Sequence, residues 1–439
     1  MRGVAAAVIA GLLLVFGLTG VADAASPLQP GNRPTPISGQ TNGELPSNLL
    51  VRLSSDCITL RPVATSLYLL LRAAEGKGVG LGTSECYRPL SGQVAAAQKW
   101  TAAGNSACAA SVSTSSSGKP LGNSYHGWGK ATDFSWEDGL RFESPVYRFL
   151  KAEAGRFGWN HPAFAEPGGS ACPEPWHWEW VGDGGRYGAD PIRADVVGLL
   201  PTASGQGYSV VTGLGALTHR GDAVDQGSTA DTPINWLMVG GARTPNGNGY
   251  WLVAADGGIF GFGGARFLGS TGGLRLNQPI VGMAPTPDGN GYWLVASDGG
   301  IFSFGTATFH GSMGGTRLNR PIVGMAATPS GKGYWLVASD GGMFAFGDAR
   351  FVGSTGGTRL NQPITGMAPT PDGNGYWLVA SDGGMFSFGN ATFAGSTGGK
   401  TLALPVVGMA PTRTGKGYWM VGADGLVFTF GDAGAFGSG

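Results

Sequence analysis

The sequence has few charged residues and very few cysteines, and each shortage excludes a class of protein. Charged residues make up 13% of the 439 positions, and 28 basic residues are balanced by 28 acidic ones. A chain without a basic excess lacks the positive face that nucleic-acid binding requires, so we expect no nucleic-acid partner. The four cysteines include no Cys-x-x-Cys pair, which argues against a zinc site built on cysteines. No Gly-x-Ser-x-Gly motif is present to form a serine nucleophile elbow.

Glycine is by contrast abundant, with 81 residues. The Gly-X-Y period of collagen is missing, and aromatic residues make up 10% of the chain, so neither a collagen helix nor a disordered chain is expected. The length is sufficient for two or three folded domains.

The N-terminus has the pattern of a secretory signal peptide. Arg2 is followed by an apolar run over 4–18 and by Ala-Asp-Ala at 22–24. We therefore expect residues 1–24 to be removed and the mature protein to be secreted, either extracellular or associated with a cell wall. The apolar run is shorter than the roughly 20 residues that cross a bilayer, and no later segment qualifies, so no membrane span is expected after cleavage.

Export to an oxidising compartment favours disulfide bonds. Cys57, Cys86, Cys108 and Cys172 all lie in one candidate domain, and four cysteines allow three pairings. Of these pairings we expect Cys86–Cys108 together with Cys57–Cys172.

Changes in composition divide the rest of the chain. Residues 25–47 are rich in Pro, Gly, Asn and Thr and are expected to form a linker or an extended arm. Residues 48–185 have the mixed pattern of an α+β domain. A glycine- and charge-rich linker over 186–193 follows, and residues 194–439 are repetitive.

Within 48–185, apolar residues at helical spacing predict helices over 61–75, about 89–103, and 145–154. Ser144 and Pro145 are suited to begin the third helix. Period-two alternation predicts a strand over 176–181, with His177 and Glu179 on one face and three tryptophans on the other.

The repetitive part predicts an all-β ring. The dipeptide Gly-Tyr recurs every 42 residues, at 207, 249, 291, 333, 375 and 417. Each well-formed unit contains two short apolar runs joined by Asp-Gly-Gly, which predicts a hairpin. With further strands at 307–310 and 321–328, a unit would have the four strands of a propeller blade.

We therefore predict a six-bladed β-propeller. The segment 195–202 resembles the fourth strand of the other units, so it is expected to complete the last blade and close the ring. A stacked β-solenoid is the structural alternative.

Two segments of the first domain bring together residues suited to metal chemistry. His126 and Asp133 lie seven residues apart, and Glu174 and His177 follow about forty residues later. Two imidazoles and one carboxylate make three ligands, and catalytic zinc typically has three protein ligands and a fourth position for water. The remaining carboxylate is then available as the base for that water. His161, just ahead of the second segment, is expected either near this cleft or at the surface.

These motifs resemble those of a known family. Ser-x-His-x-x-Gly-x-Ala-x-Asp at 124–133 is followed by Glu-Pro-Trp-His at 174–177 and preceded by Tyr-Arg at 87–88. This order resembles the VanY-type D-alanyl-D-alanine carboxypeptidases, zinc peptidases of the LAS group, over roughly residues 50–185. The family fold is a small α/β domain with an antiparallel sheet under the zinc.

The resemblance assigns roles to individual residues. It implies that one zinc ion is bound by His126, Asp133 and His177, and that Glu174 is the general base and then the acid. It further implies that Arg88 stabilises the transition state or the substrate and that Ser124 contacts the substrate.

The substrate implied by the resemblance is a peptidoglycan stem peptide, cut near its D-alanine end. Cys86 before the Tyr-Arg motif and a long Ser-rich loop after Cys108 depart from the family pattern, so an endopeptidase and an L,D-carboxypeptidase with the same zinc site remain open. A non-catalytic surface-binding protein is a third reading. The repeats resemble arrays in exported actinobacterial proteins, and we expect the propeller of a monomeric protein to bind cell-wall glycan or another surface ligand.

Overall fold

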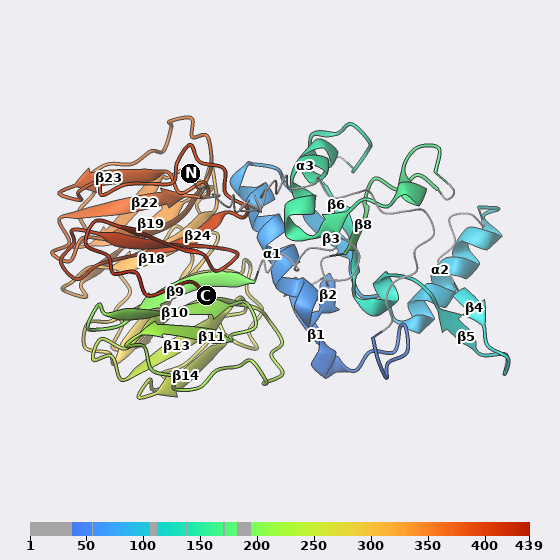
Figure 1. Ribbon diagram of the computed structural model, residues 1–439, viewed down its shortest axis with the longest axis horizontal. Coiled ribbons are helices and arrows are strands. Elements are labelled where there is room, and N and C mark those ends of the chain that lie inside the picture. The colour runs from blue at the N-terminus through green and yellow to red at the C-terminus, as the bar shows by residue number, and fades with distance from the viewer. Residues whose placement is uncertain (1–36, 55, 106–111, 137–138, 170–171, 182–194) are drawn as a thin grey trace, which may run out of the picture.

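The computed structural model describes residues 37–54, 56–105, 112–136, 139–169, 172–181 and 195–439, which form two adjoining domains (Figure 1). The predicted signal peptide, the 186–193 linker and Cys108 lie outside the described residues. None of the helices in the described ranges combines the length and the apolar character needed to cross a membrane.

The first domain is built on a four-stranded antiparallel sheet with the strand order β3-β6-β8-β7. Its strands are β3 (Gly82–Glu85), β6 (Ala131–Ser135), β7 (Trp159–Asn160) and β8 (His177–Trp180). The described residues also form two hairpins: β1 (Leu50–Ser54) with β2 (Cys57–Leu60), and β4 (Val112–Thr114) with β5 (Pro120–Gly122), which lies against α2. The predicted α+β class with a small antiparallel sheet is confirmed.

In the described part of this domain, three helices lie close to their predicted positions: α1 (Arg61–Gly76), α2 (Leu90–Ala102) and α3 (Pro145–Glu153). Ser144 caps α3, because its hydroxyl accepts the N–H of Tyr147 at 3.1 Å. Short 3₁₀ turns are η1 (Ser47–Leu49), η3 (His126–Trp128), η4 (Ala154–Phe157) and η5 (Ala163–Ala165). Leu67 and Leu70 of α1 share one apolar core with Trp178 of the sheet.

The second domain consists of six antiparallel sheets of three strands each, and the predicted all-β six-bladed propeller is confirmed. In chain order the blades are β9 (Val196–Pro201), β10 (Gly207–Thr212) and β11 (Leu217–Gly221); β12 (Met238–Arg243), β13 (Gly249–Ala254) and β14 (Ile259–Gly263); β15 (Ile280–Pro285), β16 (Gly291–Ala296) and β17 (Ile301–Gly305); β18 (Ile322–Ala327), β19 (Gly333–Ala338) and β20 (Met343–Gly347); β21 (Ile364–Pro369), β22 (Gly375–Ala380) and β23 (Met385–Gly389); and β24 (Val406–Pro411), β25 (Tyr418–Gly422) and β26 (Val427–Phe430).

The prediction of a strand at 307–310 is wrong, and blades have three strands instead of four. This segment runs between two blades, and side chains form hydrogen bonds with its backbone N–H and C=O groups. The indole of Trp293 donates to the carbonyl of Thr308 at 2.8 Å, and the N–H of His310 donates to the hydroxyl of Tyr334 at 3.1 Å. Backbone groups satisfied in this way do not need a neighbouring strand.

The prediction that 195–202 completes the last blade is also wrong. β9 lies beside β24 of the last blade, but it pairs with β10 and therefore begins the first blade. The ring closes through a contact repeated at every boundary between blades. Tyr292, for example, donates its hydroxyl proton to the carbonyl of Gly269 at 2.6 Å, and Tyr208 of the first blade donates to Gly437 of the last at 2.5 Å.

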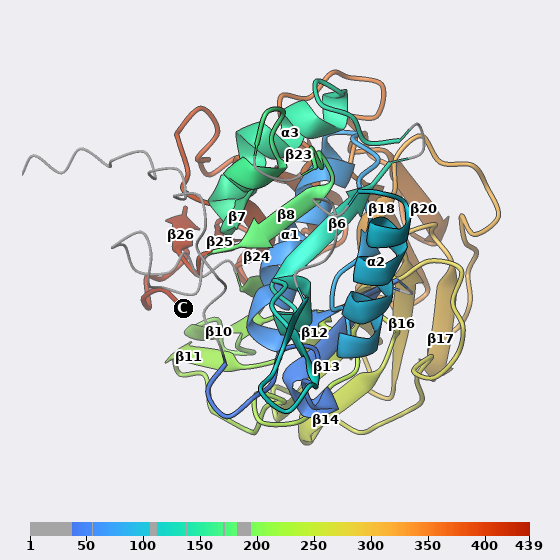
Figure 2. The same cartoon turned by 90° about the vertical axis from the view of Figure 1, so that its right-hand side faces the viewer.

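Helix α1 lies between the sheet of the first domain and the propeller ring (Figures 1 and 2). It covers one mouth of the central channel, where each inner strand contributes one residue: Val197, Val239, Val281, Val323, Thr365 and Val407. Ala64 of α1 and Val51 of β1 are buried in an apolar cluster with Val211 and Leu237 of the propeller. The two domains are therefore joined by core-like packing as well as by the chain.

Candidate metal centre and active site

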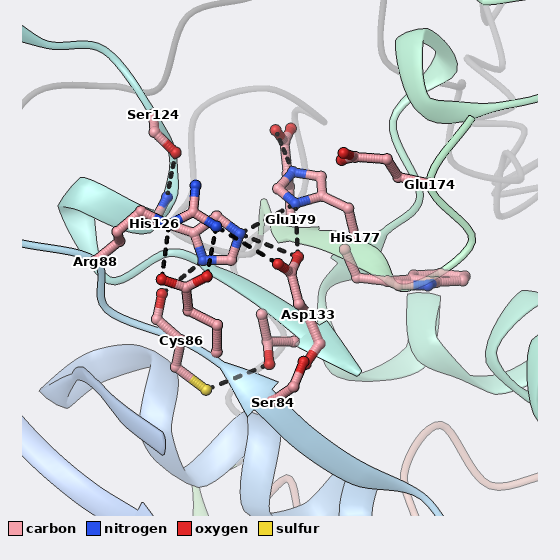
Figure 3. Close-up of polar contacts among 12 residues, drawn as sticks. Ser84, Cys86, Arg88, Ser124, His126, Asp133, Glu174, His177 and Glu179 are labelled. Atoms are coloured by element: carbon pink, nitrogen blue, oxygen red, sulfur yellow. Dashed lines mark hydrogen bonds and ion pairs between the residues drawn. The ribbon is translucent and has the colours of Figure 1, made fainter. Parts of the chain in front are cut away.

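The first domain brings His126, Asp133 and His177 together (Figure 3). His126 begins the η3 turn, Asp133 is in the middle of β6, and His177 is the first residue of β8. β6 and β8 are antiparallel neighbours in which Asp133 lies directly opposite His177. Side chains at opposite positions of neighbouring strands lie on the same face of a sheet, so this register brings the carboxylate to the imidazole.

Three atoms of this cluster form a small triangle. His126 Nε2 is 3.1 Å from Asp133 Oδ1 and 3.1 Å from His177 Nδ1, and the last two atoms are 3.0 Å apart. The two histidines are buried, and the Asp133 side chain is 14% exposed.

In each imidazole, the nitrogen outside the triangle lies beside an oxygen acceptor, and this contact orients the ring. His126 Nδ1 lies 2.6 Å from the carbonyl oxygen of Cys86, an acceptor, so it carries the proton. His177 Nε2 lies 3.3 Å from Glu179 Oε1 and is protonated for the same reason. His126 Nε2, His177 Nδ1 and a carboxylate oxygen of Asp133 therefore converge, and with both nitrogens deprotonated they form a donor set that can hold a cation.

Zinc fits this donor set. Zinc bonds of about 2.0–2.1 Å in tetrahedral geometry place ligand atoms about 3.3 Å apart, close to the observed sides of the triangle. The electrostatics of the site also favour a cation. Burial opposes charge on His177, but the carboxylates of Asp133 and Glu179 outweigh burial and raise its pKa to about 10, so a metal bound here would replace a proton on Nδ1. Burial likewise opposes the charged Asp133 carboxylate, but the imidazoles of His126 and His177 hold its pKa below the usual range.

Glu174 lies just before β8, and its carboxylate is directed toward the cluster from the side of His177 (Figure 3). Its N–H donates to the carbonyl of Ala165 at 2.8 Å, and its own carbonyl accepts the N–H of His177 at 3.1 Å. Burial raises the pKa of the Glu174 carboxyl, and the neighbouring Asp133 carboxylate raises it further. A carboxylate with a raised pKa is better suited to take up a proton during catalysis.

His161 lies beneath this segment and away from the triangle. It is buried, and its Nε2 is 2.9 Å from the carbonyl oxygen of Glu174. Its ring packs edge-on against Phe142, Tyr147 and Trp178. His161 therefore supports the backbone of Glu174, and because its ring is buried, the expected position at the surface is wrong.

Arg88 is held by two carboxylates. Its Nε and Nη2 donate to the two oxygens of Glu85 at 2.7 and 2.6 Å, and Nη2 is also 3.6 Å from Asp133 Oδ2. The guanidinium thus orients Asp133, and its contact with substrate or transition state stays a prediction. Sequence reasoning missed Glu85, although this residue lies in the same short segment as the Tyr-Arg motif.

Ser124 caps the turn that carries His126. Its hydroxyl accepts the N–H of His126 at 3.1 Å, and its carbonyl accepts the side-chain N–H of Asn42 at 2.8 Å. The structure therefore gives Ser124 a role in shaping the metal loop, and its contact with substrate stays a prediction.

A second pair that sequence reasoning missed lies behind the turn. Buried Gln93 donates to the side-chain oxygen of Asn42 at 2.9 Å and to the carbonyl of Arg88 at 3.2 Å. A Cβ at Gly127 would lie 1.9 Å from Asn42 Oδ1, so only glycine fits there. Asn42 belongs to the segment expected to be a linker or arm, but Asn42, Gly43 and Leu45 of that segment are buried in the first domain.

The predicted disulfide pairing is wrong, because Cys57 is bonded to Cys86. β2 and the end of β3 lie side by side, which brings together two cysteines 29 residues apart in sequence. Cys172 is also disulfide-bonded. The Cys57–Cys86 bond secures the strand end whose carbonyl holds the His126 ring.

Removing this bond is expected to destabilise the first domain. For a loop of this length, replacing Cys57 and Cys86 with alanine should lower the free energy of unfolding by about 3–4 kcal/mol. Denaturant titration of the oxidised protein measures the change, with the exposed substitution Ser91→Ala as a control. Equal midpoints for the variant and the wild type would contradict the expectation.

Comparison with known proteins finds a family match within the first domain. Residues 59–183 match the family model VanY, D-alanyl-D-alanine carboxypeptidase. No curated protein matches the sequence.

Two solved structures are similar to the chain. One is the Cps50 (Swd1) β-propeller domain of Myceliophteria thermophila, with 12% identity and a TM-score of 0.33, over 44% of this chain and 65% of that one. The other is a structural genomics protein of unknown function from Bacteroides thetaiotaomicron, with 11% identity and a TM-score of 0.38, over 54% of this chain and 69% of that one. This chain therefore spans less than two thirds of the first structure, and the propeller description rests on the strand pairing and closure contacts given above.

Proposed function

We propose, from the premise that residues 59–183 form a VanY-type domain, that the protein is a zinc-dependent D-alanyl-D-alanine carboxypeptidase acting on peptidoglycan stem peptides. The family match supports a peptidase of peptidoglycan in general. The observation that carries the finer proposal is the convergence of three lone-pair donors, His126, Asp133 and His177, beside a carboxyl group with a raised pKa. Export of the mature protein and a monomeric state are parts of the same proposal.

The residues of this site divide the work of hydrolysis. Zinc held by the three ligands would lower the pKa of a bound water molecule and polarise the scissile carbonyl. Glu174 takes the proton as the water oxygen bonds to the carbonyl carbon, and it delivers that proton to the leaving amine as the C–N bond breaks. The Cys86 carbonyl and Glu179 keep both imidazoles in the tautomer that binds metal. Arg88 lies beside Asp133 and can stabilise an oxyanion with its positive charge.

The direct test is mass spectrometry of pentapeptide-bearing muropeptides incubated with the mature protein. We expect loss of one terminal alanine, abolished by a zinc chelator and restored when zinc is added back. Release of larger fragments would instead identify an endopeptidase, and loss of alanine from tetrapeptides would identify an L,D-carboxypeptidase. No change in a zinc-loaded sample would refute the peptidase proposal and favour a binding protein.

A further inference from the structure

One blade of the propeller differs from the other five at the face of the ring away from α1. In five blades, a side chain in the loop after the inner strand is hydrogen-bonded to a side chain just after the outer strand. We call this bond the clasp. The clasp pairs are Ser204 with Asp222, Asp288 with Thr306, Ser330 with Asp348, Asp372 with Asn390, and Thr414 with Asp432.

The second blade lacks the clasp, because its corresponding residues are Asn246 and Gly264. Gly264 has no side chain, and a Cβ there would lie 2.5 Å from Asn248 Oδ1. At this position a groove of about 540 Å³ opens between the second and third blades. Its lining includes Asn248, Arg266, Asp288 and Asn290. The groove thus offers amide groups together with one charge of each sign.

An exposed aromatic residue is the sequence neighbour of Arg266, which lines this groove. Phe267, which follows Arg266, is 64% exposed. Its backbone is fixed on both sides, because the carbonyl of Arg266 accepts the indole N–H of Trp251 at 2.7 Å and the N–H of Leu268 donates to the Tyr292 hydroxyl at 3.1 Å. An exposed apolar ring on a segment held in this way loses little conformational freedom when a ligand covers it.

We propose that this groove and Phe267 form a carbohydrate-binding site for a stretch of glycan strand. Sugar hydroxyl and acetamido groups both donate and accept hydrogen bonds, so they can pair with the side-chain amides of Asn248 and Asn290 that line the groove. The C–H face of a sugar ring suits an exposed aromatic ring. The opposite charges of Arg266 and Asp288 balance, which fits a ligand of low charge density.

The choice of a peptidoglycan glycan strand rests on the proposed function, because the stem peptides cut by the first domain are carried on such strands. The inner strands run from the channel mouth covered by α1, at Val281, to the opposite face, where the groove opens. Glycan bound there leaves the metal centre free. The site therefore holds the enzyme on its polymer without blocking the peptidase.

The test is binding of peptide-free glycan strands, released from purified sacculi by an amidase and measured by isothermal titration. Replacing Asn246 with Ser, Asn248 with Gln and Gly264 with Asp copies the first blade, which has Ser204, Gln206 and Asp222. This clasp-restoring variant and Phe267→Ala are each expected to lower the affinity at least about tenfold. The matched control is Phe309→Ala, which removes an equally placed ring, 58% exposed, beside a closed clasp, and it should bind like the wild type.

Three results would overturn the proposal: no binding by the wild type, unchanged binding by the clasp-restoring variant, or an equal loss for Phe309→Ala and Phe267→Ala. Hydrolysis of soluble muropeptides is measured for the same variants, so that a failure of the glycan site can be distinguished from a failure of the proposed peptidase function. Lost glycan binding with normal hydrolysis in the groove variants supports the site. Normal glycan binding by a chain without peptidase activity would refute the proposed function alone.

Discussion

Replacing Glu174 with glutamine is expected to lower kcat by about 10²- to 10⁴-fold, the usual contribution of a general acid–base residue. Glutamine has nearly the same shape but cannot take up the proton of the attacking water. The three metal ligands are left intact, so the variant should bind one zinc ion as the wild type does. Initial rates on a peptide ending in D-Ala-D-Ala, together with zinc analysis by mass spectrometry, measure both quantities.

The control for this substitution is Glu143→Gln, which changes an exposed carboxylate on the loop before α3 in the same domain. It should leave kcat and zinc content unchanged. Full activity of Glu174→Gln would show that another group is the base. Loss of zinc from the variant would show that Glu174 is a ligand, contrary to the assignment made here.

The pH dependence of the wild type follows from the same residue. A general base acts only when deprotonated, and burial raises the pKa of Glu174 above that of an ordinary glutamate. As pH falls, kcat/KM should therefore begin to decrease at a higher pH than an unperturbed glutamate would give. The residual activity of Glu174→Gln should lack this acid limb.

The sequence indicated which residues would converge, because His126, Asp133 and His177 lie in two short segments of unusual composition. The supporting contacts of the site depend on long-range geometry instead. Whether Asp133 lies opposite His177 is decided by the register of two strands about forty residues apart, and a shift of one residue would turn the carboxylate to the other face. Asn42 could not be recognised, because nothing in a Pro- and Gly-rich segment indicates that it folds back onto the metal loop.

The disulfide pairing and the blade structure likewise depend on long-range contacts that the sequence alone does not show. Spacing alone does not distinguish three pairings of four cysteines, and the observed Cys57–Cys86 bond follows from neighbouring strands. The 42-residue period predicted the number of blades, because each repeat buries its own Tyr and five of the six also bury a Trp. It could not show that Trp293 and Tyr334 would take the hydrogen bonds of the expected strand at 307–310.

The interface between the two domains is expected to couple their unfolding. Ala64 of α1 is completely buried between the domains, together with Val51. Nearby, the N–H of Arg52 donates to the carbonyl of Asn235 in the propeller at 2.8 Å, and Thr65 packs against Gly213. At another point of the interface, Leu404 of the propeller contributes to the core of the first domain. Because each domain completes the core of the other, we expect the wild type to unfold in one cooperative transition.

Replacing Ala64 with aspartate is expected to lower the free energy of unfolding by about 3–5 kcal/mol, since it places an unpaired carboxylate in an apolar contact. Differential scanning calorimetry should show an earlier onset and separate transitions for the first domain and the propeller. The matched control is Ala95→Asp, at an exposed position of α2, which should unfold like the wild type. If both variants unfold like the wild type, the contact at Ala64 does not couple the unfolding of the two domains. A single transition shifted to lower temperature would mean that the rest of the interface still couples them, because Arg156 also donates to the carbonyl of Ala403 at 3.3 Å.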